Sequence, residues 1–66
     1  MGENIWEFVK DEDGTYSVFH RRKQLASKIP EAWFEAQLCH DYGFCGAEAD
    51  EIRRKITECG KCTLVL

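Results

Sequence analysis

Two segments rich in apolar residues flank a charged loop near the start of the chain and predict a β-hairpin. Residues 4–10 (NIWEFVK) and 15–21 (TYSVFHR) are rich in β-branched and aromatic side chains, which is typical of strands. The charged segment between them ends in Gly14, which adopts the left-handed conformation of a short loop at little cost. Residues 22–28 are then expected to form a polar connection.

The residues after Pro30 change to helix formers, EAWFEAQL. Pro30 suits a first helical turn because its missing N–H would have no intrahelical partner there. We predict a helix over residues 30–41 that ends in a Schellman motif, with Gly43 left-handed and Phe44 folded back onto the last turn. A third strand over residues 33–39 is the alternative.

A second helix is predicted over residues 46–58, directly after Cys45. Cys45 and Glu48 have the spacing of a capping box, with cysteine in the place of serine. Gly60 is placed to end the helix, and residues 62–66 (CTLVL) favour a last strand. The helix carries a narrow apolar stripe at spacings of three and four residues, formed by Ala49, Ile52, Ile56 and Cys59.

These elements predict a small α+β fold in one domain, residues 1–66. The order is ββααβ, with both helices packed on one face of a three-stranded antiparallel or mixed sheet. A strand over residues 33–39 would change the order to βββαβ. A chain of 66 residues buries only about 60% of the surface that it exposes when unfolded, so a thin core is expected.

All four cysteines lie in the second half of the chain, and a metal site is one hypothesis for them. Zinc requires ligands within about 2.0–2.3 Å of the ion, whereas a straight helix over residues 46–58 separates the two cysteine pairs by roughly 20 Å. We therefore expect no shared metal and no cofactor. The candidate ligands of the metal alternative are Cys39, His40, Cys45, Cys59 and Cys62.

The preferred interpretation makes Cys39 and Cys59 small core residues, Cys45 a helix cap and Cys62 a strand residue. Cys39 and Cys45 could also form a disulfide across the predicted turn in an oxidising compartment. Redox chemistry is disfavoured at Cys59-x-x-Cys62 because this pair follows a helix C-terminus, where the dipole opposes a thiolate. Neighbouring helical side chains such as Cys39 and His40 diverge by about 100°, which argues against nucleophilic catalysis. We expect a protein that is not an enzyme.

The net charge of −3 argues against general affinity for nucleic acids or anionic membranes. We expect the basic residues of the second helix to be neutralised at i,i+4 by acids, Arg54 by Asp50 and Lys55 by Glu51. Pairing with acids is also preferred for the basic segment 20–28, with nucleic-acid binding as an alternative. That alternative would use Arg21, Arg22, Lys23 and Lys28. The acidic opening segment has no leader or membrane-span pattern, so a cytoplasmic location is expected.

Large apolar side chains point to both faces of the predicted hairpin and to both sides of the first helix. Two short helices cover only one face of a sheet, which favours an exposed apolar patch that contacts a protein partner or a second copy. We therefore predict a protein-binding module, such as an inhibitor, adaptor, subunit or regulator. Its predicted contact residues are Trp6, Phe8, Phe34 and Leu38.

Overall fold

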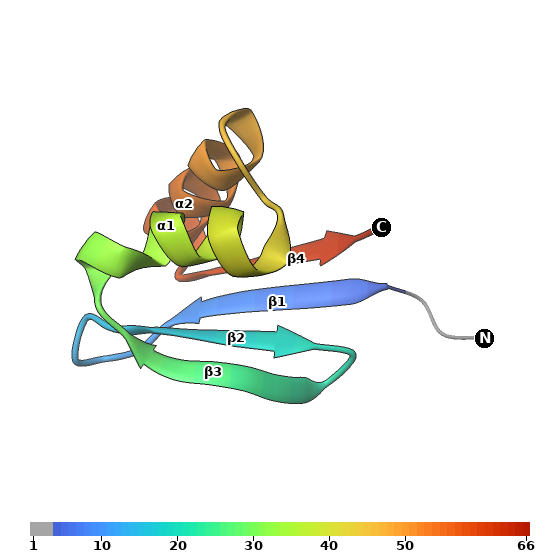
Figure 1. The fold of residues 1–66 in the computed structure, drawn as a ribbon. Coiled ribbons are helices and arrows are strands. Elements are labelled where there is room, and N and C mark those ends of the chain that lie inside the picture. The colour runs from blue at the N-terminus through green and yellow to red at the C-terminus, as the bar shows by residue number, and fades with distance from the viewer. Residues whose placement is uncertain (1–3) are drawn as a thin grey trace.

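A computed structural model describes residues 4–66 and has an α+β fold (Figure 1). Residues 1–3 of the acidic opening segment lie outside the described part. The elements, in order, are β1 (Ile5–Lys10), β2 (Tyr16–His20), β3 (Lys23–Ile29), α1 (Glu31–Tyr42), α2 (Ala47–Cys59) and β4 (Lys61–Val65). The four strands form an antiparallel sheet in the order β3-β2-β1-β4, and both helices lie on the same face of it. The predicted hairpin, helix pair and final strand are confirmed.

The sheet contains a strand that the sequence analysis treated as a polar connection. β3 pairs with β2 through a two-residue turn, Arg21-Arg22, which places His20 opposite Lys23. Both turn residues have positive φ angles, 54° and 67°, as a type I′ hairpin turn requires. Such turns are usually formed by Asn-Gly, so Arg-Arg gave no turn signal. The sheet therefore has four strands instead of three.

The first helix agrees closely with the prediction, and the alternative strand over residues 33–39 is wrong. Pro30 directly precedes α1, and Gly43 ends it with φ 79°. The Gly43 N–H donates to the Cys39 carbonyl at 3.2 Å and the Phe44 N–H to the Leu38 carbonyl at 2.8 Å. The Gly43 bond is the 5→1 bond of the αL C-cap motif, whereas the Phe44 bond spans one residue more than the 6→1 bond of the predicted Schellman motif. Gly43 is left-handed as predicted, and the buried Phe44 lies back over the last turn.

The second helix begins after Gly46, and the predicted capping box does not form. No side-chain hydrogen bond caps α2, because Gly46 and not Cys45 occupies the N-cap position, and the sulfur of Cys45 is bonded to Cys39. The apolar stripe is shorter than predicted, since Cys59 is exposed. Gly60 ends the helix in the left-handed conformation, φ 83°, and leads directly into β4.

The core lies between the sheet and the two helices. Phe8 of β1 and Val18 of β2 contribute from the strands and Ile52 from α2, all fully buried. The Phe34 ring of α1 stacks on Tyr16 with the ring centroids 4.0 Å apart. The remaining buried apolar side chains are those of Ile29, Leu38, Phe44, Ala49, Ile56 and Cys62. Within residues 4–66, no helix is long and apolar enough to cross a membrane.

Candidate functional site

The four residues predicted to contact a partner do not form a surface patch. Phe8, Phe34 and Leu38 are at most 1% exposed and belong to the core. Trp6 packs against that core, and its other side stacks on His20 with a centroid distance of 4.0 Å. The packing of the sheet against the helices explains this: Trp6 and Phe8 point from the sheet toward the helices. Phe34 and Leu38 lie on the side of α1 that faces the sheet.

Cys39 and Cys45 form a disulfide whose Cα atoms are 4.4 Å apart. The left-handed turn at Gly43 reverses the chain between the end of α1 and the start of α2, and this reversal brings the two residues together. Both are exposed, so the interpretation of Cys39 as a core residue and Cys45 as a cap is wrong. The disulfide alternative describes their geometry correctly.

Cys59 and Cys62 remain free and differ in exposure. Cys59 is exposed, which contradicts its assignment to the core, whereas Cys62 is a buried strand residue as predicted. Burial raises the pKa of the Cys62 thiol, and the charges of Lys55 and Glu51 act on it in opposite directions. Among residues 4–66, no three His, Cys, Asp or Glu side chains gather in a way that could hold a metal ion.

The basic segment lies on the surface and is paired only at one end. Lys28 Nζ lies 3.7 Å from Asp13 Oδ2. Hydrogen bonds from Thr15, together with the charge of Lys28, lower the pKa of Asp13. Arg21, Arg22 and Lys23 are exposed at the β2–β3 turn, and within residues 4–66 they make no ion pair.

The charges of α2 partly follow the prediction. Lys55 pairs with Glu51 at 3.9 Å, as expected, but Arg54 also pairs with Glu51, at 3.8 Å, instead of with Asp50. Arg53 reaches across to α1, where its guanidinium binds Glu31 at 3.1 Å and also Glu35. These two carboxylates raise the pKa of Arg53 and hold the helices side by side.

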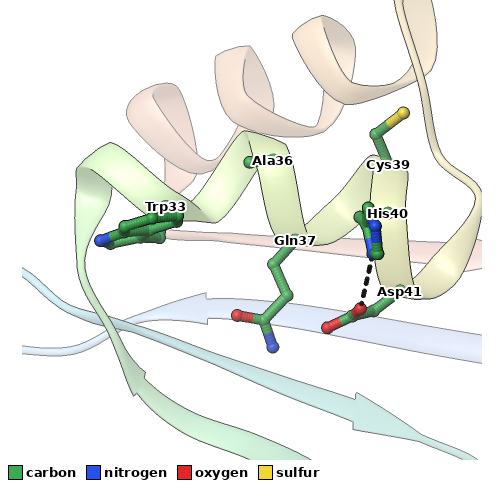
Figure 2. Close-up of a pocket in the computed structure, with 6 residues that line it drawn as sticks. All are labelled: Trp33, Ala36, Gln37, Cys39, His40 and Asp41. Atoms are coloured by element: carbon green, nitrogen blue, oxygen red, sulfur yellow. Dashed lines mark hydrogen bonds and ion pairs between the residues drawn. The ribbon is translucent and has the colours of Figure 1, made fainter.

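A hollow of about 530 Å³ lies on the solvent side of α1 (Figure 2). Trp33 lies at one end, His40 at the other, and Gln37 lies between them. His40 Nδ1 is 3.3 Å from Asp41 Oδ1. The lining residues are Trp33, Ala36, Gln37, Cys39, His40 and Asp41.

The helical repeat explains why this hollow exists. Trp33, Gln37 and His40 follow at intervals of four and three residues, which places them on one side of a helix. Ala36 lies on the same side, and its small side chain leaves space between the two rings. Trp33 is 65% exposed, although burying an aromatic ring of this size is favourable. Sequence reasoning found both apolar sides of the helix but chose the buried side as the partner surface.

Comparisons of the chain with protein-family models, with curated proteins and with solved structures found no match.

Proposed function

We propose that this protein is a non-catalytic protein-binding module and that the hollow on α1 is its contact surface. The observation that carries the proposal is the exposed Trp33 ring at the end of an apolar hollow. Tryptophan is among the residues most enriched at the energetic centres of protein interfaces, because its large ring loses much water contact when it is covered. His40 and Asp41 form an acid–base pair in the lining of the hollow, but both side chains are exposed to solvent, and the lining holds no serine or threonine and its cysteine, Cys39, is bonded to Cys45.

The partner we propose is a segment with an apolar side chain next to an arginine or lysine. The apolar side chain would enter the space above Ala36, between the rings of Trp33 and His40. The cation would lie over the indole face, an arrangement that a tryptophan ring favours, or beside the half-exposed carboxylate of Asp41. The net charge of −3 favours the approach of a basic partner over that of an acidic one.

Selection from a displayed library of random short peptides tests the proposal. We expect the enriched peptides to combine leucine or an aromatic residue with arginine or lysine. Replacing Trp33→Ala should weaken their binding at least about tenfold, the loss typical of an interface hot spot. Leu25→Ala is the matched control, since Leu25 is also an exposed apolar residue but lies on β3, outside the hollow. Peptides that bind the Trp33→Ala variant as tightly as the unchanged protein would contradict the proposal.

We also propose that the protein acts in the cytoplasm, which has a consequence for Cys39 and Cys45. Reducing compartments keep exposed cysteine pairs as thiols, so this disulfide would be open in most molecules. Rapid alkylation of the protein in intact cells, followed by mass spectrometry, should then find both residues modified. Recovery of an intact Cys39–Cys45 disulfide would instead indicate an oxidising compartment.

A further inference from the structure

We propose that two copies of this chain associate through the outer edges of their β4 strands to form one continuous eight-stranded sheet. The two strands run antiparallel about a two-fold axis at Thr63. This interface lies at the opposite edge of the sheet from β3 and leaves the hollow on α1 free. The inference does not depend on the proposed function.

The two edges of the sheet differ in how they are protected against such pairing. β3 forms one edge, and its pairing with β2 is interrupted by register shifts. Its residue Lys28 has a positive φ of 54°. Bulges and lysines of this kind prevent a further strand from adding. β4 pairs with β1 in unbroken register, contains one charged residue, Lys61, and has no strand on its outer side within residues 4–66.

The outward-facing backbone N–H and C=O groups of β4 suit a symmetric pair of β4 strands. The Leu66 N–H donates to the Asn4 carbonyl at 2.9 Å, and the Lys10 N–H donates to the Gly60 carbonyl at 3.1 Å. Bonded and non-bonded pairs alternate in an antiparallel ladder. The even-numbered residues of β4 therefore bond to β1, and the odd-numbered residues 61, 63 and 65 direct their N–H and C=O groups outward.

A two-fold axis at Thr63 places these outward groups in register. Thr63 then lies opposite the partner's Thr63, and Lys61 lies opposite the partner's Val65. By symmetry, Val65 lies opposite the partner's Lys61. Each of these three pairs exchanges two hydrogen bonds, about six in total. Paired threonines are favourable cross-strand neighbours, and this register keeps the two Lys61 charges at opposite ends of the interface.

The helices also fit this arrangement. α2 packs over β4 and β1, and adjacent strands are about 4.8 Å apart. For an α2 axis centred between β4 and β1, a two-fold axis midway between β4 and its copy would place the two α2 helices roughly 10 Å apart, near the usual packing distance of about 8–10 Å.

Charges on the outer side of α2 are complementary under the same symmetry. Arg53 faces α1 through its bonds to Glu31 and Glu35, and positions two residues away lie about 200° around the helix. Glu51 and Lys55 therefore lie on the side that faces the free edge, and both influence the buried Cys62 thiol of β4. Because the two α2 helices would run antiparallel, Glu51 comes near the partner's Lys55.

Sedimentation equilibrium tests the inference at protein concentrations between about 10 µM and about 1 mM. This range covers dissociation constants that correspond to a free energy of association of roughly 4–7 kcal/mol. Cys59→Ser is included in every sample to exclude a disulfide between copies through that exposed thiol. We expect a monomer–dimer equilibrium that Thr63→Pro weakens at least about tenfold, because it removes two hydrogen bonds at the centre. Proline is tolerated where a strand N–H faces solvent, so the monomer should remain folded by circular dichroism. Thr63→Ala is the matched control, since it keeps the N–H and should keep the dimer.

A charge exchange provides a second test that does not depend on the backbone of β4. Lys55→Glu should weaken the dimer several-fold by placing like charges together, and adding Glu51→Lys should restore it. A monomer at all concentrations would overturn the inference. A dimer that both Thr63→Pro and Lys55→Glu leave unchanged would also overturn it and would indicate another interface, such as the open face of the sheet.

Discussion

Replacing the β2–β3 turn residues by Arg21→Asn and Arg22→Gly should stabilise the protein. Both residues have positive φ angles, 54° and 67°, and this conformation costs an L-residue with a Cβ atom roughly 1–2 kcal/mol. Asparagine tolerates the conformation better and glycine adopts it freely, although glycine also increases the entropy of the unfolded chain by about 0.5–1 kcal/mol. The expected net gain is about 1–2 kcal/mol in the free energy of unfolding.

Urea and thermal unfolding followed by circular dichroism measure this gain. For a domain of this size, each kcal/mol corresponds to about 4–8 °C, so the midpoint should rise by roughly 4–16 °C. Arg21→Gln with Arg22→Gln controls for the lost charges and should change stability little. Arg54→Gly, within α2, should instead lower stability by about 1 kcal/mol because glycine is unfavourable inside a helix. A turn variant that is no more stable than the unchanged protein would refute the assigned turn and, with it, the register of β3.

Three further predictions concern the core and the cysteines. Phe34→Ala should lower the free energy of unfolding by about 3–5 kcal/mol, whereas Trp33→Ala should change it by less than about 0.5 kcal/mol. Urea titration compares the two variants, and equal losses of stability would show that Trp33 also belongs to the core. Removing the disulfide, which joins residues 6 positions apart, by replacing both cysteines with serine should cost about 2 kcal/mol. Burial raises the pKa of the Cys62 thiol above its usual value, so the folded state holds this proton more tightly than the unfolded chain does. The stability that this provides should be lost as the pH rises through the folded pKa. Cys62→Ala should remove that decline from stability curves measured above about pH 9.

Local signals predicted the elements that carry their own boundary residues. Pro30 and Gly43 define the ends of α1, and Gly60 defines the end of α2, because proline and left-handed glycine restrict the backbone directly. β3 has no such signal: its turn is Arg-Arg, its residues are mostly polar and exposed, and only pairing with β2 makes it a strand. Tertiary structure therefore decided the conformation of this segment.

The candidate site was harder to predict because a helix with two apolar sides does not show which side faces inward. Phe34 and Leu38 formed one side, and Trp33 with Ala36 the other. The sheet determines the choice, since Phe8 and Tyr16 provide aromatic surfaces that pack with Phe34. The disulfide depended similarly on the tight reversal at Gly43, which sequence reasoning identified without establishing the pairing of Cys39 and Cys45.

The central claim is that partners contact α1 through its solvent side and not through the hairpin. Titration of the ¹⁵N-labelled protein with a selected peptide tests it most directly, because the two tryptophan indole N–H groups report on different surfaces. We predict that the Trp33 indole signal and the backbone signals of Ala36, Gln37 and His40 shift with peptide concentration, while the indole signal of Trp6 stays in place. Shifts confined to Trp6 and β1, with Trp33 unchanged, would contradict the claim.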